Sequence, residues 1–167
     1  MDAEIRTLQP EDVDDVAMVH VQAWQAVYPG VMTDEFLQSL SSDVAADYWS
    51  LVAWRRDGNA FVARCDGQIA GCAAVGEHRK PGPAVGELYG LNVAPEYWGT
   101  GVGTQLLHRA ERRLRQLGFS EVVLYVATAN ARGRRFYERE GWTDDGIDDV
   151  EEFGGQQVEE RRYSRRL

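Results

Sequence analysis

Three glycines alternate with other residues between two segments of opposite character. Gly99, Gly101 and Gly103 follow a predicted strand at 86–93 and precede a predicted helix whose apolar positions run from Val102 to Leu117. Glycine lets the backbone bend without Cβ clashes, so several N–H groups can converge on one anion. The helix adds its positive N-terminal end. The segment therefore predicts a site for a phosphate or pyrophosphate group.

The familiar phosphate-binding fingerprints do not fit this segment. The dinucleotide pattern G-x-G-x-x-G/A fails because it ends on Thr104 when read from Gly99 and on Leu106 when read from Gly101. The Walker pattern fails because the segment holds no lysine. A glycine turn that caps the helix and binds no ligand is the structural alternative.

The hydrophobic periodicity predicts one domain over residues 1–167, of mixed α/β class rather than a regularly alternating barrel. The continuous apolar run EVVLYVA is typical of a buried strand, and VEERRYSRR (158–166) is expected to pair at a sheet edge. The predicted strands are 4–8, 60–65, 68–76, 86–93, 121–127 and one or two within 142–167. Five helices are predicted: one that starts at Pro10, one over 34–40, one over 45–55, one directly after the glycines, and one over 130–140.

Two cysteines flank a predicted two-residue hairpin turn at Asp66-Gly67. In that register Cys65 lies opposite Gln68 and Cys72 lies opposite Phe61, which places the two sulfurs too far apart along the ladder for a disulfide. No metal-ligand spacing is present, and the acidic run 144–152 lacks the alternation of a calcium loop and reads as a solvated loop or edge. A reducing cytoplasmic location is expected.

The charge balance argues against nucleic acid as a partner, because the net charge is −9. No apolar stretch reaches the ~18 residues that a membrane-spanning helix needs, so no membrane association is expected. Residues 81–143 are net +2, whereas residues 1–80 are net −7 and residues 144–167 are net −4. This distribution suits an anionic ligand in the middle of the chain and a cationic ligand elsewhere.

Two motifs together resemble one protein family. ELYGLNVAPEYWGTGVGTQLL, followed about thirty residues later by LYVATANARGRRFYEREGW, is similar to the acyl-CoA segments of the GNAT superfamily of N-acyltransferases. The resemblance implies a central, mostly antiparallel sheet of six to seven strands, splayed between the fourth and fifth and flanked by helices on both faces. It also implies acetyl-CoA as co-substrate, with no metal. A homodimer is left open.

The resemblance further implies which residues contact acetyl-CoA. Backbone amides around Gly99 to Thr104 would hold the pyrophosphate, and the pantetheine arm would enter between strands 87–93 and 121–127. Trp98 stands where the family often has Gln or Arg, so a side-chain phosphate contact is expected to be missing. The residues expected at the cofactor are Leu91, Asn92, Val93, Trp98, Gly99, Thr100, Gly101, Val102, Gly103, Thr104, Asn130, Arg132, Arg135 and Phe136.

Each of the polar candidates has a structural alternative. Asn130 can cap its helix instead of contacting pantetheine, and Arg132, Arg134 and Arg135 can form a solvated helix face. Tyr137 occupies the family position of the tyrosine that protonates the leaving sulfur, and its alternative is packing beside Phe136.

Glu87 is the candidate general base. It lies eleven residues ahead of Trp98, the spacing of the glutamate that acts, often through water, in the histone-acetyltransferase branch of the family. A water chain or another carboxylate is the other possibility for this step, and a solvent-facing residue at a strand start is the structural alternative. Trp24, Tyr28 and Phe36 lie where the superfamily builds its acceptor pocket, although aromatic residues at this spacing also occur as core packing.

These observations favour an N-acetyltransferase that moves the acetyl group of acetyl-CoA to a primary amine by direct attack. Neither cysteine lies in the motifs, so no covalent intermediate is expected. The acceptor is a small-molecule or peptide amine, predicted from the charge distribution to be positively charged. A catalytically silent acyl-CoA-binding regulator is the alternative, and a nicotinamide oxidoreductase is a distant third.

Overall fold

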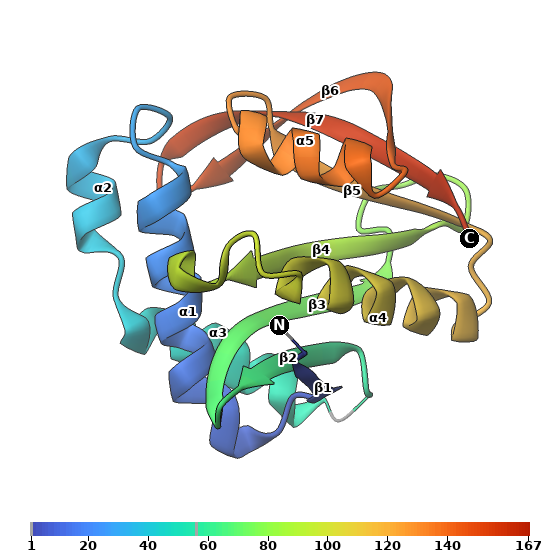
Figure 1. Cartoon of the computed structure of the whole chain (residues 1–167). Helices are drawn as coiled ribbons and strands as arrows, with labels where there is room; N and C mark the ends of the chain where they lie inside the picture. Colours follow the sequence, from blue (N-terminus) through green and yellow to red (C-terminus); the bar gives the residue numbers. More distant parts are fainter. Residues whose placement is uncertain (1, 56) are drawn as a thin grey trace.

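A seven-stranded sheet forms the centre of the protein, in the strand order β1-β2-β3-β4-β5-β7-β6. The structure is a computed structural model that describes residues 2–55 and 57–167 (Figure 1). The strands are β1 (Glu4–Thr7), β2 (Ala60–Cys65), β3 (Gln68–Glu77), β4 (Gly86–Val93), β5 (Glu121–Ala127), β6 (Thr143–Phe153) and β7 (Gln156–Arg166). The helices are α1 (Val13–Val27), α2 (Asp34–Ser39), α3 (Ser42–Trp54), α4 (Val102–Gln116) and α5 (Ala131–Arg139), with short 3₁₀ turns at Pro10–Asp12 and Pro95–Tyr97.

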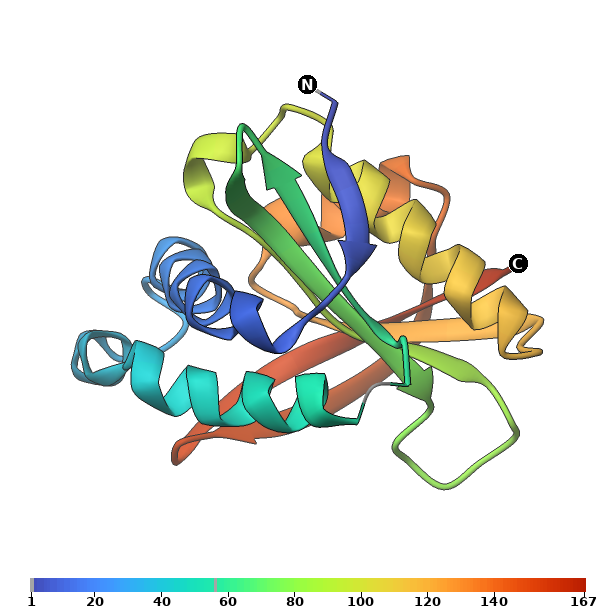
Figure 2. The ribbon, with the colours of Figure 1, turned by 90° about the horizontal axis from the view of Figure 1, so that it is seen from below.

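Helices cover both faces of the sheet. One core cluster joins α4 and α5 to the sheet through residues such as Leu106, Leu114 and Tyr137. A second cluster joins α1 and α3 to the opposite face through residues such as Val16 and Trp49. Seen from below in Figure 2, α1 and α3 lie on one side of β2 and β3, and α4 lies on the other. The mixed sheet flanked by helices confirms the predicted fold class.

β4 and β5 diverge, as predicted. Their parallel pairing is confined to Gly86–Leu88 with Val122–Leu124, and all other neighbouring strands are antiparallel. A bulge lies where the divergence begins, because Ala74 pairs with Gly90 and Val75 with Leu88, which leaves Tyr89 as the extra residue. Beyond Leu88 the β5-facing edge of β4 is therefore turned toward a gap in the sheet.

The hairpin register is confirmed at one cysteine and wrong at the other. Cys65 pairs with Gln68, but Cys72 pairs with Val62 rather than Phe61. A bulge between Ala63 and Arg64 adds one residue to β3, and this shifts every pair beyond it. Both cysteines are free and buried, so the absence of a disulfide between them is confirmed.

Element ends differ by a few residues from those predicted. The third helix begins at Ser42 rather than Ala45 because the Ser41 side chain accepts a hydrogen bond from the amide of Asp43. Residues 10–12 form a 3₁₀ turn before α1. No helix among the described residues is long and apolar enough to cross a membrane.

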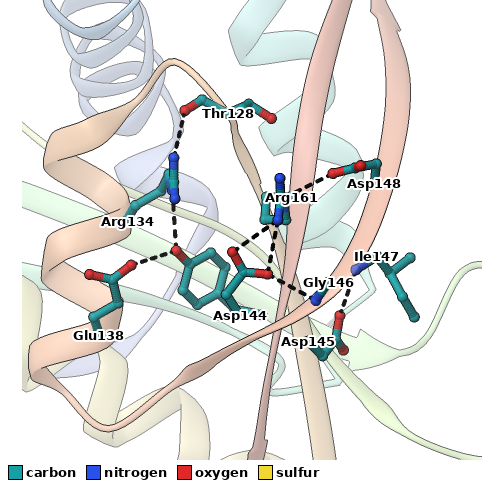
Figure 3. Close-up of polar contacts among 10 residues, drawn as sticks. Thr128, Arg134, Glu138, Asp144, Asp145, Gly146, Ile147, Asp148 and Arg161 are labelled. Carbon is teal, nitrogen blue, oxygen red and sulfur yellow. Dashed lines mark hydrogen bonds and ion pairs between the residues drawn. The ribbon is translucent and has the colours of Figure 1, made fainter.

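The segment 158–166 is not at a sheet edge. It lies in β7, between β5 and β6, and the acidic segment 144–152 forms the edge strand β6 instead. Two arginines of β7 are accommodated inside the sheet because β6 supplies their counter-charges: Arg161 pairs with Asp144 and Asp148 (Figure 3), and Arg162 pairs with Asp145. The edge strand keeps its acidic residues, which oppose pairing with another chain.

Candidate active site

A cleft of about 820 Å³ occupies the gap between β4 and β5. It extends from the glycine loop (residues 98–104), past Tyr137, to α1 and the β6–β7 hairpin. Sixteen predicted site residues line it: Trp24, Tyr28, Glu87, Leu91, Asn92, Val93, Trp98, Gly99, Gly101, Gly103, Thr104, Asn130, Arg132, Arg135, Phe136 and Tyr137. Three predicted residues do not line it: Phe36, Thr100 and Val102.

The glycine loop presents backbone donors to the cleft. Gly99 and Gly101 have φ of 78° and 93°, a region that side chains disfavour, and α4 begins directly after Gly101. The first hydrogen bond of α4 runs from the amide of Gln105 to the carbonyl of Gly101 at 3.1 Å. The amides of residues 102–104 precede that bond, so they have no acceptor within the helix. The loop thus has the geometry of an anion site, although the Val102 side chain is buried in the core.

The Trp98 ring holds the guanidinium of Arg132 beside the glycine loop. The indole Nε1 of Trp98 donates to the carbonyl of Val93 at 2.8 Å, which fixes the ring against the end of β4. The guanidinium of Arg132 lies 3.9 Å from the centre of that ring. A cation held over an indole face is a favourable arrangement, worth ~0.5–1 kcal/mol at an exposed site. Trp98 therefore contributes to the loop indirectly, because it holds the positive charge of Arg132 beside it.

α5 positions the remaining cofactor candidates. The Asn130 side chain accepts a hydrogen bond from the amide of Gly133 at 2.8 Å, so it caps α5. Asn130 also lines the cleft. Arg134 turns away, because its guanidinium donates to the carbonyl of Thr128 and the hydroxyl of Tyr163, each at 3.2 Å (Figure 3). Arg132 and Arg135 line the cleft, whereas Arg134 does not.

Tyr137 is buried at the wall of the cleft. Its side chain is 9% exposed, and its ring packs against Phe136 and Trp142. Burial, with a smaller contribution from Tyr28, raises the pKa of the Tyr137 hydroxyl. A phenol in this position keeps its proton at neutral pH, as a proton donor must.

Glu87 is buried and ion-paired rather than solvent-facing. It is 1% exposed, and Arg79 donates three hydrogen bonds to its carboxylate: from the backbone amide at 2.9 Å, from Nε at 2.9 Å and from NH2 at 2.6 Å. Arg79 in turn lies over the ring of Tyr89 at 5.2 Å. The pair joins the start of β4 to the loop after β3 at one wall of the cleft.

Aromatic rings from α1, its C-terminal end and β6 form one wall of the cleft. The ring of Trp24 lies 5.1 Å from that of Tyr28 and 4.9 Å from that of Phe153 on β6, and all three residues line the cleft. Phe36 lies against Gly154 at the β6–β7 turn instead, where a Cβ on that glycine would clash with its ring. His20 also lines the cleft, and burial lowers its pKa to about 4, so its imidazole is neutral.

Two cleft carboxylates were not predicted from the sequence. Glu151 on β6 and Glu160 on β7 line the cleft, and each has a carboxylate oxygen within 4.8 Å of the other and of Asp149. Burial, followed by the charge of Glu151, raises the pKa of Glu160 to about 7. The sequence contains one signal for Glu160. Alternate residues of a strand share a face, so the charged Glu160 lies on the same face as the buried Val158.

Comparison with known proteins agrees with this geometry. Residues 24–142 match the model of the Acetyltransferase (GNAT) family. The chain is 30% identical over 128 residues to the uncharacterized N-acetyltransferase YuaI of Bacillus subtilis, covering 75% of this chain and 72% of that protein. It is 27% identical over 164 residues to a spermidine N(1)-acetyltransferase of Thermoplasma acidophilum, covering 98% and 99% of the two chains.

A solved structure shows the same fold over the full length of both chains. It is the PaiA N-acetyltransferase of Thermoplasma acidophilum in complex with coenzyme A, with a TM-score of 0.77 and 25% identity. The matched family model spans the glycine loop and Tyr137, and the fold likeness extends to the β6–β7 hairpin. The chain therefore belongs to the GNAT family of acetyltransferases.

Proposed function

We propose that the protein transfers the acetyl group of acetyl-CoA to a primary amine on a positively charged acceptor. The observation that carries this proposal is one continuous cleft that joins the glycine loop to Tyr137 and then to the carboxylates of β6 and β7. An anionic cofactor and a cationic acceptor can enter from its two ends and meet beside Tyr137. The predicted cytoplasmic location suits a supply of acetyl-CoA and two reduced cysteines.

The residues present fit acetyl-CoA. The amides of residues 102–104 and the N-terminal end of α4 suit the pyrophosphate, and Arg132 lies beside them on Trp98. A Cβ on Gly90 would meet no atom within 4 Å, so this part of β4 borders open space. The unpaired edge of β4 beyond Leu88 can hydrogen-bond the amides of a pantetheine arm as a neighbouring strand would.

The cleft residues can carry out the transfer by direct attack. The acceptor must lose a proton, its nitrogen then forms a bond to the thioester carbonyl, and the leaving sulfur takes a proton as the carbon–sulfur bond breaks. Tyr137 is the proton donor to sulfur. The sequence predicts Glu87 for the first proton, directly or through water; its three hydrogen bonds from Arg79 also suit it to positioning that arginine.

The acceptor end of the cleft suits a cation with an aliphatic body. Trp24, Tyr28 and Phe153 offer ring faces, and Glu151 and Glu160 offer negative charge opposite them. A small polyamine or a peptide amine has this chemistry. The name of one relative, a spermidine N(1)-acetyltransferase, points to the same class of acceptor.

We expect an amine screen that detects release of coenzyme A to select cationic acceptors. Because acceptor and cleft attract each other through charge, kcat/KM for the best acceptor should fall as ionic strength rises, over a Debye length of ~8 Å at 0.15 M. Thermal melting at each salt concentration controls for general effects of salt on the fold. A preferred acceptor that is neutral or anionic, with kcat/KM independent of salt, contradicts the charge argument.

A catalytically silent acyl-CoA-binding regulator is the second candidate. It would retain the glycine loop but would need neither a buried tyrosine hydroxyl in the cleft nor carboxylates at the acceptor end. Binding of acetyl-CoA by calorimetry without turnover of any amine in the screen would favour this alternative.

The Arg132→Gln variant is expected to bind coenzyme A more weakly. A charge-assisted contact to phosphate contributes ~1.5–3 kcal/mol, and the exposure of Arg132 reduces this, so we expect the Kd to rise about tenfold. The affinity for pantetheine, which has no phosphate, should not change. Arg134→Gln is the matched control on the same helix, because Arg134 is held by Thr128 and Tyr163. Equal Kd values for the Arg132 and Arg134 variants would contradict the assignment.

A further inference from the structure

Glu160 is the one buried carboxylate that lacks a partner among the described residues. Four acidic side chains are buried: Asp12, Glu87, Glu111 and Glu160. Asp12 accepts two hydrogen bonds from Arg6, Glu87 accepts three from Arg79, and Glu111 accepts bonds from Trp142 and Arg165. Glu160 is 8% exposed, and within residues 2–55 and 57–167 its carboxylate has neither a hydrogen bond nor an ion pair.

The position of this carboxylate is set by the sheet. Glu160 pairs with Ala127, the last residue of β5, and with Asp149 of β6. It shares a face with Val158, which packs with Met32 and Leu37, so its side chain points to the α1 face and lines the cleft. A carboxylate that is mostly buried and has no protein partner is costly to keep charged, so at the wall of a cleft it is suited to a ligand that completes it.

Charged groups of both signs surround the Glu160 carboxylate. β6 contributes Glu151 and Asp149, and Asp149 is bonded to Lys80; β4 contributes Glu87, and the loop after β3 contributes Arg79 and Lys80. Burial and Glu151 outweigh the two cations, which leaves the pKa of Glu160 at about 7. A carboxyl group with this value accepts a proton at neutral pH and gives it back to water readily.

Glu160 is also electrostatically linked to the proton donor. α1 contributes Tyr28, whose pKa is raised to about 12 by burial and by the charge of Glu160. Tyr28 in turn contributes to the raised pKa of Tyr137. The three side chains line one cleft, with Glu160 toward the acceptor end.

We propose that Glu160, rather than Glu87, takes the proton from the ammonium group of the acceptor, directly or through one water. This inference rests on the proposed acetyltransferase function. The contrast with Glu87 is geometric, since three donors already occupy the Glu87 carboxylate and none occupies that of Glu160.

The protons balance through the reaction. The acceptor ammonium gives one proton to Glu160, and the neutral amine forms the nitrogen–carbon bond. The nitrogen gives up a second proton as the carbon–sulfur bond breaks, and this replaces the proton that Tyr137 donates to sulfur. Glu160 then releases its proton to solvent, so the products are the acetylated amine, the free thiol of coenzyme A and one proton.

The test compares Glu160→Gln, Glu87→Gln and Glu159→Gln in kcat and KM against pH, with the best acceptor of the amine screen. Glu159 is the matched control, because it is the exposed neighbour on the opposite face of β7. For the wild type we expect kcat/KM to rise through a group that ionises near pH 7. Glu160→Gln should lose that step and lower kcat by roughly 10²–10⁴-fold, and the Glu159 variant should match the wild type.

Thermal melting supplies a second readout. A carboxyl whose folded-state pKa is raised destabilises the fold progressively as pH rises from its unfolded-state pKa of ~4.3 to the folded-state value, so the variant should melt higher than wild type at pH 8 and the difference should shrink toward pH 5. If Glu160 had only a structural role, the Glu160→Gln variant would instead lose both stability and activity.

Distinct outcomes overturn the two proposals. An active wild type whose pH step survives in Glu160→Gln, or a variant that raises KM alone, contradicts proton transfer by Glu160 and leaves the acetyltransferase intact. Loss of the pH step in Glu87→Gln assigns the step to Glu87. A wild type that binds acetyl-CoA but acetylates no amine overturns the proposed function, and the role of Glu160 with it.

Discussion

The Tyr137→Phe variant is expected to bind acetyl-CoA with unchanged affinity and to turn over roughly 10²–10⁴-fold more slowly, the usual range for a lost proton donor. The ring keeps its packing against Phe136 and Trp142, so only the hydroxyl is removed. Because burial raises the pKa of that hydroxyl, the donor stays protonated at neutral pH, and the loss should be uniform from pH 6 to 9. Single-turnover rates measure the loss of turnover, and calorimetry measures the affinity for acetyl-CoA.

Tyr163→Phe is the matched control for this experiment. The Tyr163 ring is fully buried, and its hydroxyl donates to Glu138 at 2.7 Å and accepts from Arg134, outside the cleft. This variant should lose about 1 kcal/mol of stability and keep its turnover. A Tyr137→Phe enzyme that works at the wild-type rate would make Tyr137 a packing residue.

Replacing Gly101 by valine is expected to abolish tight binding of acetyl-CoA. Gly101 has φ of 93° at the start of α4, and forcing a β-branched residue there costs ~1–2 kcal/mol in backbone strain. A Cβ at this position meets only Gln105 Nε2 at 4.0 Å, and Gly101 lines the cleft, so the new side chain takes up space at the glycine loop. We expect calorimetry to show a Kd raised at least about a hundredfold, as for two lost charge-assisted hydrogen bonds.

Gly118→Val separates strain from binding. Gly118 ends the same helix with φ of 92°, and a Cβ there meets no atom within 4 Å. The two variants should lose similar stability, but only Gly101→Val should lose affinity. Unchanged affinity in a folded Gly101→Val protein would rule out the glycine loop as the pyrophosphate site.

The sequence predicts those parts of the fold that local pattern determines. Strands 60–65, 86–93 and 121–127 match their predicted bounds because each is a short apolar run between turn residues. The glycine loop was predicted because alternating glycines at a strand-to-helix junction have few other uses. The bulges at Ala63/Arg64 and at Tyr89 were not placed by periodicity, since an extra residue in one strand depends on its partner.

Long-range pairing accounts for what the sequence did not predict. The Arg79–Glu87 pair crosses from a loop to a strand, and the residue type of Glu87 carries no sign of it. VEERRYSRR reads as an edge because four of its nine residues are arginine, yet β6 neutralises two of them. Glu160 was missed for the same reason, because its burial depends on where β7 is inserted.

The insertion of β7 between β5 and β6 also means that the two ends of the cleft depend on different kinds of contact. β7 follows both neighbours in the chain, and its pairing with β5 joins residues far apart, such as Glu121 with Arg166. The glycine loop and the start of α4 are built from residues that are close together in the sequence. Glu160, in contrast, reaches the cleft only through the pairing of β7 with β5 and β6. The cofactor end of the cleft therefore depends on local sequence, and the acceptor end depends on how distant strands pair.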